Sequence, residues 1–219
     1  MSGNTRVALA HAQRLTDMLV KTLKPACERI EVAGSIRRKK ATVGDIEIVC
    51  IPTIVETNLP GQLSLFGMGE DRPAEIRVES KLEKLLQRLV DEKVLRDQPP
   101  TGIDARAAQG PRYKKFWKRE PVQGEWMQID LFITTATSWG AIYTIRTGPG
   151  DFSKAMVTHI KIATKYRQMG GDLIVEETGE VVPVPEEIDY FRRAGVAFIE
   201  PKARSVGALR SALAQGRGG

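Results

Sequence analysis

The sequence predicts an α+β protein, in which a mixed sheet flanked by helices is followed by a smaller α+β module. Segments of alternating apolar residues, typical of strands, are interspersed with segments of helical periodicity over the first two thirds of the chain. The pattern changes near Gly148–Gly150, after which short strands and helices follow one another. We therefore expect one domain over residues 1–148, a second over 149–205, and a basic, glycine-rich, flexible tail over 206–219.

The first domain is predicted to mix helices and strands. A helical apolar stripe ends at Pro25, and alternation in the next segments indicates strands on either side of Gly34. Glycine and proline crowd the following segment, which predicts an exposed loop before an amphipathic helix whose apolar stripe begins at Val78. The expected elements are a helix at 5–24, strands at 28–33 and 45–51, a loop at 52–73, a helix ending near 91, a short strand at 94–96 and a hairpin of 113–117 with 126–134.

The second part of the chain is predicted to be more helical. A short helix is expected at 138–146, and a longer one at 151–169 that stops at the pair Gly170 and Gly171. Short strands at 173–176 and 181–183 and a helix at 185–193 complete the prediction.

Bulk properties restrict the class of protein. The 219 residues carry a formal net charge of +6, and cations cluster at 37–40 and 112–119, which favours a nucleic acid or nucleotide partner over charge for solubility alone. No apolar run approaches a membrane span and no signal-peptide pattern is present, so we expect a soluble, cytoplasmic monomer with no membrane contact. Cys27 and Cys50 form no metal-type pair, so we expect free thiols.

Three acids on strands are the candidate catalytic residues. Asp45 and Glu47 are two residues apart in a strand, so their side chains share one face, and Asp130 lies on a later strand. If the two strands are neighbours, the three carboxylates converge and need cations to offset their repulsion. Two Mg²⁺ ions, with Mn²⁺ as the alternative, would form the usual clamp for phosphoryl transfer. The sequence therefore predicts a metal-dependent site for a nucleoside triphosphate.

A glycine-serine turn precedes these acids by ten residues and supplies groups for phosphate binding. Gly34 lets the backbone approach a ligand, and the Ser35 hydroxyl and nearby N–H groups can donate to phosphate oxygens. Arg38 adds a bidentate donor. Taken singly, the turn and the cations would be only a turn and a solvated edge, but together with Asp45 and Glu47 they favour a functional site.

Four segments resemble the X-family DNA polymerases, which are the DNA polymerase beta-like nucleotidyltransferases. VAGSIRRKKATVGDIEIV is similar to the family signature, MQIDLFI to its third-acid strand, and SWGAIYTIRTGP to the segment that reaches the incoming sugar and base. GEVVPVPEEIDYFRRAGVAFIEPKAR resembles the end of the thumb domain. The resemblance covers about residues 5–205 and implies a minimal palm-plus-thumb enzyme without the lyase and helix-hairpin-helix domains of larger relatives.

The resemblance also implies roles for individual residues. Asp45, Glu47 and Asp130 would hold the metals, and Asp130 would activate the primer 3′-hydroxyl. The remaining implied residues are the triphosphate ligands Gly34, Ser35, Arg38 and Gly44, and the sugar-pocket residues Thr147 and Gly148.

Two positions depart from the family pattern. Glu47 stands where these polymerases usually have Asp, and Ile145-Arg146 replaces the aromatic pair that discriminates deoxyribose from ribose. Metal geometry and sugar selectivity are therefore the two properties in which this chain would differ from the family.

Two further segments are candidate binding surfaces. The run after Pro111 is basic and interleaved with aromatic residues, which predicts DNA contact, with a solvated strand edge as the alternative. Its candidate residues are Arg112, Lys114, Lys115 and Lys118. The segment Gln62-Leu63-Ser64-Leu65-Phe66 resembles the pentapeptide that docks bacterial replication proteins on the sliding clamp, although Leu65 and Phe66 could instead fold onto this chain's own core.

The expected function is DNA primer extension from nucleoside triphosphates, with pyrophosphate release, in gap-filling repair. Two alternatives remain at this point. One is nucleotide transfer to an RNA end or a small molecule, and the other is a DNA-binding or clamp-tethered accessory whose site has decayed.

Overall fold

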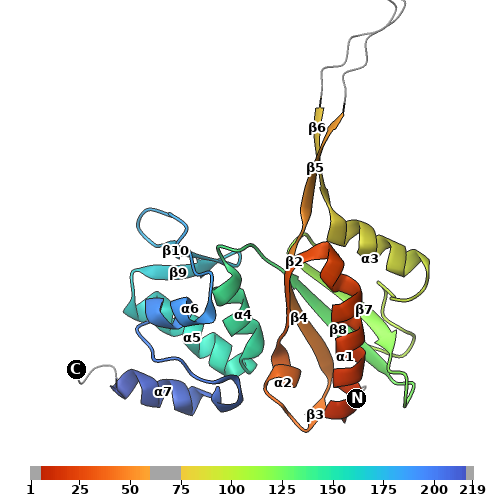
Figure 1. The fold of residues 1–219 in the computed structure, drawn as a ribbon. Coiled ribbons are helices and arrows are strands. Elements are labelled where there is room, and N and C mark those ends of the chain that lie inside the picture. The colour runs from red at the N-terminus through yellow and green to blue at the C-terminus, as the bar shows by residue number, and fades with distance from the viewer. Residues whose placement is uncertain (1–5, 60–74, 216–219) are drawn as a thin grey trace, which may run out of the picture.

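A computed structural model describes residues 6–59 and 75–215 and has an α+β architecture (Figure 1). One mixed four-stranded sheet carries the first part of the chain, and three two-stranded sheets add to it. Helices flank the main sheet, and a mostly helical second part lies beside it (Figure 1). Within the described residues, no helix is long and apolar enough to cross a membrane.

The main sheet has the strand order β2-β4-β8-β7. Its strands are β2 (Cys27–Val32), β4 (Asp45–Pro52), β8 (Trp126–Ile133) and β7 (Tyr113–Arg119). The central pair β4 and β8 is parallel, whereas β2 and β7 run antiparallel to their neighbours. The expected hairpin of β7 with β8 is confirmed, and the strands that bear the acids, β4 and β8, are neighbours, which is the condition for their carboxylates to converge.

The two faces of this sheet differ in chemistry. Ile46, Ile48 and Cys50 of β4 are fully buried, and they belong to the largest apolar core, together with residues of α1 (Leu9–Leu23) and α3 (Lys81–Asp91). Asp45 and Glu47 alternate with them and therefore point to the opposite face. Their face is the one against which Trp139 and Tyr143 of α4 (Trp139–Thr147) pack further along the strands.

The N-terminal segment and the 34–43 loop form short elements around the main sheet. Val7 and Ala8 pair with Val43 and Thr42, so the first helix starts at Leu9, later than expected. The elements are β1 (Val7–Ala8), η1 (Lys24–Ala26), α2 (Gly34–Arg37) and β3 (Thr42–Val43).

The prediction of a loop at 52–73 is wrong for the residues of this segment that the structure describes. Ile54–Leu59 forms β5 and pairs antiparallel with β6, Glu75–Ser80, in a hairpin that projects from the body (Figure 1). The alternating, β-branched sequence of β5 favours a strand despite the prolines around it. Val78 belongs to β6 and is 62% exposed, so the apolar stripe of α3 begins only at Leu82, after the Ser80 N-cap accepts a hydrogen bond from the Glu83 amide.

The second part of the chain packs helices around a small hairpin. The helix expected to reach residue 169 ends at Ala163, where the Thr164 side chain bonds the Ile160 carbonyl and accepts from the Tyr166 amide. Residues 206–215, expected to belong to a flexible tail, form a helix whose Leu209 is buried. The elements are α5 (Gly150–Ala163), β9 (Tyr166–Met169), β10 (Asp172–Val175), α6 (Glu187–Arg193), η2 (Pro201–Ala203) and α7 (Val206–Gln215).

Candidate active site

The three acids predicted from the sequence lie on adjacent strands and on one face of the sheet. In the parallel ladder, Glu47 of β4 is directly opposite Asp130 of β8, and Asp45 is opposite Gln128. Because residues opposite each other in a ladder point the same way, all three carboxylates are on the face away from the main core. Convergence of the three carboxylates requires this register between β4 and β8.

Asp130 is held by two neutral donors. The Tyr113 hydroxyl donates to Asp130 Oδ1 at 2.8 Å, and Gln128 Nε2 donates to Oδ1 at 3.0 Å and Oδ2 at 3.1 Å. The Tyr113 ring stacks on Phe132 with centroids 5.1 Å apart. Burial, followed by the bond to Asp130, raises the pKa of Tyr113, so the hydroxyl remains a donor. Sequence reasoning missed both residues. Only the cross-strand register places Tyr113 beside Asp130, whereas the position of Gln128 two residues earlier in the same strand already puts it on the face of Asp130.

Glu47 is half-buried and packs against Gly34. Gly34 has φ of +59°, and a Cβ built on it would lie 1.9 Å from Glu47 Oε2, so only glycine fits this backbone beside this carboxylate. Burial raises the pKa of Glu47 to about 8, with the charges of Asp45 and Asp130 adding to the effect. Burial and the charge of Asp130 also raise the pKa of Asp45. The site therefore concentrates negative charge that is costly without a cation.

The three carboxylates are suitable ligands for Mg²⁺, but their oxygen atoms do not converge on one metal position. Three carboxylates are the hard oxygen ligands that Mg²⁺ prefers, and the raised pKa values of Asp45 and Glu47 are what a divalent cation would offset. Over residues 6–59 and 75–215, however, no group of three or more His, Cys, Asp or Glu side chains is arranged to hold a metal. The orientations explain this, because Glu47 lies against Gly34 while Tyr113 and Gln128 hold Asp130. Metal binding would therefore require the Asp130 carboxylate to turn from Tyr113 and Gln128 toward Asp45 and Glu47, on strands that already have the right register.

A hollow of about 520 Å³, which we call the acid hollow, opens beside Asp45 and Glu47. Ser35, Arg38 and Arg146 also line it, whereas Asp130 is not among its lining residues. The Ser35 hydroxyl, Arg38 Nε and Arg146 Nε are buried and have no protein partner. Buried donors without partners are costly, so a hollow lined by three of them is suited to an anionic ligand. Burial lowers the pKa of Arg38, which still carries its charge at neutral pH.

The remaining ligand residues expected from the resemblance separate into two groups. Gly44 and Gly148 line the acid hollow, and a Cβ on Gly148 would lie 2.4 Å from Phe152 Cδ1, so close packing against Phe152 requires glycine there. Thr147 is fully buried and does not line the hollow. Its hydroxyl accepts from Arg37 Nη1 at 2.7 Å and its carbonyl accepts from Arg38 Nη1 at 2.6 Å, so it positions the two arginines.

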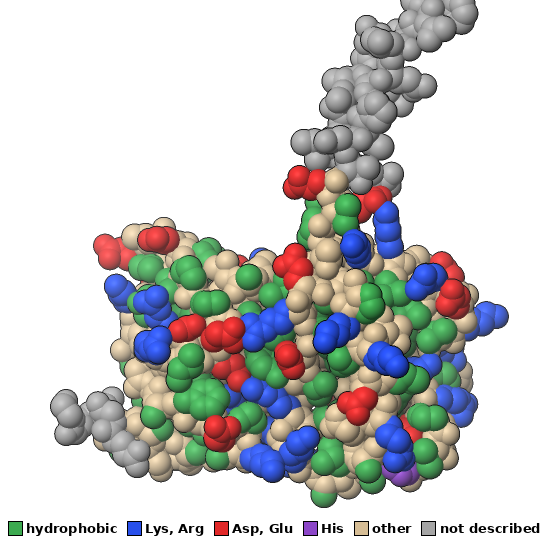
Figure 2. All heavy atoms as spheres, in the orientation of Figure 1, with side chains coloured by type: hydrophobic (Ala, Val, Ile, Leu, Met, Phe, Trp, Pro, Cys, Tyr) green, Lys and Arg blue, Asp and Glu red, His purple; other side chains and the backbone are tan. Residues whose placement is uncertain are grey.

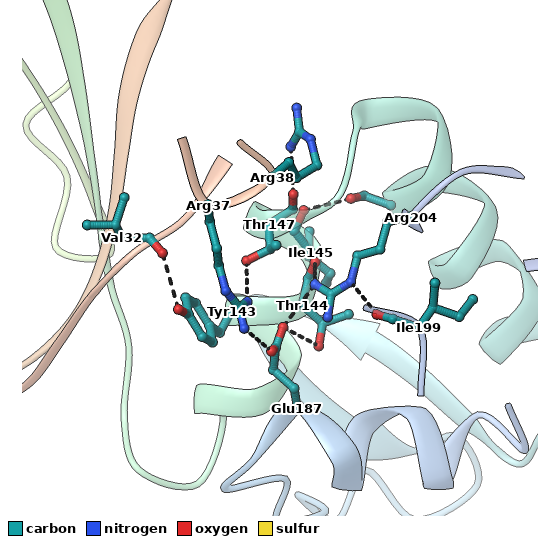
Figure 3. A network of polar contacts seen from close by, with 11 residues as sticks. Val32, Arg37, Arg38, Tyr143, Thr144, Ile145, Thr147, Glu187, Ile199 and Arg204 are labelled. Atoms are coloured by element: carbon teal, nitrogen blue, oxygen red, sulfur yellow. Dashed lines mark hydrogen bonds and ion pairs between the residues drawn. The ribbon is translucent and has the colours of Figure 1, made fainter. Parts of the chain in front are cut away.

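A polar network joins the glycine-serine turn to the second part of the chain (Figure 3). Glu187 accepts from Arg37 Nη2 at 2.5 Å and from Arg204 Nη1 at 2.9 Å, and its neighbour Glu186 forms a bidentate pair with Arg29. Burial alone would raise the pKa of Glu187, but the two arginines outweigh it and the pKa lies below its ordinary value. On the face in Figure 2, blue Lys and Arg side chains lie with red acids along this junction. These pairs tie α6 to α2 and β2.

The four cations expected to bind DNA do not share one surface. Lys115 is opposite Asp130 and lies on the face of the acids. Lys114 and Lys118 point the other way, where Lys114 pairs with Glu83 at 3.1 Å and Lys118 donates to the Val94 carbonyl at 2.9 Å. Arg112 bonds the Gly170 carbonyl and pairs with Asp172. Strand alternation therefore leaves one of the four, Lys115, directed toward the candidate site.

The clamp-like segment lies outside the described residues, and so do its candidate contacts Gln62, Leu63, Leu65 and Phe66. The two cysteines are free thiols, as expected from their spacing.

No protein-family model matches this chain, and no curated protein matches it either. The function therefore has to be inferred from the residues and their arrangement.

Proposed function

We propose that this chain is a metal-dependent DNA nucleotidyltransferase of the DNA polymerase beta type, which extends a primer 3′-hydroxyl in gap-filling repair. The observation that carries the proposal is the register of β4 and β8. It sets Glu47 opposite Asp130, with Asp45 on the same face, beside a hollow lined by unpartnered donors. Residues 1–148 would act as the palm domain and 149–205 as the thumb.

In this proposal the chain's own residues bind the triphosphate and receive the primer proton. The Ser35 hydroxyl and the free Nε donor of Arg38 would hold the phosphates. The primer hydroxyl would give its proton to Asp130 as its oxygen bonds the α-phosphorus, while the bond to the bridging oxygen breaks and pyrophosphate leaves. Mg²⁺ or Mn²⁺ held by Asp45, Glu47 and Asp130 would lower the pKa of the hydroxyl and neutralise the leaving group.

The position of Arg146 bears on the choice of sugar. Its guanidinium carbon lies 4.0 Å from the centroid of the Phe132 ring, and its Nε is one of the free donors of the acid hollow. An arginine there offers a polar group where the family has an aromatic side chain. We therefore propose that ribonucleoside triphosphates are accepted alongside deoxyribonucleoside triphosphates.

The test is primer extension on gapped DNA with Mg²⁺ or Mn²⁺, with dNTPs and NTPs in separate reactions. We expect extension by the wild type, loss of at least about 1,000-fold in Asp130→Ala, and full activity in the matched control Asp91→Ala, which changes an exposed acid on α3. No extension by the wild type under any of these conditions would refute the proposed function. Equal activity in Asp130→Ala would refute the assignment of the acids.

A further inference from the structure

A second hollow, of about 620 Å³, lies at the outer end of the main sheet. It is bounded by the end of α3, the segment 93–98, and the ends of β7 and β8 that the hairpin joins. We call it the tryptophan hollow because Trp117 and Trp126 line it. Its charged lining side chains are four cations and one acid: Lys93, Arg96, Lys118, Arg119 and Asp97.

Two arginines in this hollow are fixed against one indole ring. The guanidinium carbons of Arg96 and Arg119 lie 5.3 and 4.7 Å from the centroid of Trp126. Among the described residues, neither arginine forms an ion pair, and their one side-chain hydrogen bond runs from Arg119 Nη1 to the Gly124 carbonyl. A guanidinium stacked on an aromatic ring keeps its N–H edge free for a phosphate. The hollow therefore presents two exposed guanidinium groups that can donate to a phosphate, and Asp97 is the one acid in its lining.

Trp117 gives a second, independent indication of a ligand. Its side chain is 1% exposed and its indole nitrogen has no hydrogen-bond partner, although it lines the hollow. A buried N–H without an acceptor is costly and is rare in folded proteins. An acceptor oxygen or ring nitrogen brought by a ligand would satisfy it.

Trp117, Arg119 and Trp126 of the tryptophan hollow point to the same face of the sheet as the acids, whereas Lys118 lines it from the other face. Trp117 is opposite Gln128 and Arg119 is opposite Trp126, and Trp126 precedes Asp130 by an even number of residues in β8. Four residues of strand span about 13 Å, so a polymer that leaves Asp130 along β8 reaches the hollow within a few nucleotides. β7 is the outermost strand of the main sheet, on the side away from α4–α7 (Figure 1), and isolated bridges pair its Trp117 with Arg96 and its Lys114 with Gln109.

We propose that the tryptophan hollow binds a single strand of DNA continuous with the strand in the active site, through its phosphates at Arg96 and Arg119, a base at the partly exposed Trp126 ring, and an acceptor atom at the Trp117 N–H. Aromatic rings beside a cationic groove are the arrangement by which proteins hold unpaired strands. A duplex would present phosphates but no unstacked bases. The identity of the polymer as DNA depends on the proposed function, whereas the site itself depends on the contacts of Arg96, Arg119, Trp117 and Trp126.

The experiment measures binding, separately from catalysis, in the full chain carrying Asp130→Ala. The probe is fluorescein-labelled oligothymidylate of 20 nucleotides, followed by anisotropy over a series of NaCl concentrations, with a blunt duplex of the same length for comparison. The test variant is Arg96→Gln with Arg119→Gln. The control is Lys81→Gln with Arg88→Gln, which removes the same charge from exposed positions of α3.

We expect the test variant to bind the single strand about 10-fold more weakly than the parent. The slope of the logarithm of the association constant against the logarithm of the salt concentration should become less negative by about 1.4, as for two lost phosphate contacts. The control should stay within twofold of the parent, and duplex binding should change by less than threefold. Trp126→Ala should weaken single-strand binding with little change in slope, because it removes the support of the arginines and not their charge. Test and control variants of equal affinity would overturn the proposal, and so would a larger loss for the duplex than for the single strand.

Failure of the proposed function has a different signature. Wild-type protein that binds oligothymidylate with the expected dependence on Arg96 and Arg119, yet extends no primer, would refute the polymerase proposal and leave the tryptophan hollow as a binding site.

Discussion

Replacing Gly34 with alanine tests the proposed site at its closest contact. The new Cβ would lie 1.9 Å from Glu47 Oε2, and contacts below 3.0 Å are essentially never seen, so this carboxylate has to retreat by roughly 1 Å or more. The residue also stays at φ of +59°, which costs a non-glycine residue about 1–2 kcal/mol. We therefore expect a modest loss in the free energy of unfolding together with a large loss of extension, on the order of 100-fold, because a displacement of 1 Å in a catalytic group is that costly.

Gly179→Ala is the matched control for this substitution. Gly179 has φ of +73°, but a Cβ there meets nothing within 4 Å, so the variant carries the backbone strain without the clash. Urea denaturation should give similar losses of unfolding free energy for the two variants, and single-turnover extension should fall in Gly34→Ala alone. If Gly34→Ala extended primers within about threefold of Gly179→Ala, the reasoning that places Glu47 in the active site would be refuted.

Three further predictions concern charge. The pKa of Glu47, about 8, lies above its ordinary value of 4.5, so the folded chain keeps a proton that the unfolded chain releases, and stability falls as pH rises from about 4.5 to 8. Glu47→Gln should therefore stabilise the metal-free protein at pH 8, by up to about 5 kcal/mol, but not at pH 4; equal urea midpoints for variant and wild type at pH 8 would contradict this. Glu187→Gln should lower the free energy of unfolding by about 3–5 kcal/mol, because it leaves the buried Arg204 without its charge partner. Glu186→Gln removes an exposed ion pair and should lower it by less than about 1 kcal/mol. Thermal unfolding measures both variants, and equal losses of stability would contradict this prediction. If Glu47 holds its metal loosely, wild-type primer extension should be faster with Mn²⁺ than with Mg²⁺. Glu47→Asp should then bring the two rates closer together. Equal rates with the two metals in the wild type would argue against loose binding.

The parts of the site that depend on local alternation could be predicted from the sequence. Asp45 and Glu47 share a face because they are two residues apart, and the same spacing places Gln128 beside Asp130. The adjacency of β4 to β8 and the contact of Tyr113 with Asp130 could not be predicted in this way. Tyr113 reaches it only because residue 113 is opposite residue 132, which is a register between two strands and not a pattern within one.

The errors have different physical causes. Prolines and glycines around β5 predict a loop, but pairing with β6 makes the segment a strand. The apolar periodicity of α5 does not indicate the local Thr164 bonds that end the helix. The basic run at 112–119 does not form one surface, because strand alternation directs Lys114 and Lys118 to the face opposite Lys115.

The parallel pairing of β4 with β8 also has a consequence for synthesis of the chain. β4 is complete about 75 residues before β8 begins, and a parallel strand cannot be supplied by a tight turn. While the ribosome makes the intervening residues, one side of β4 lacks its partner, and Glu47 lacks the strand that brings Asp130 beside it. The site therefore forms late in the emergence of the chain, and the exposed edge of β4 is where a nascent or partly folded molecule would be most prone to pair with another.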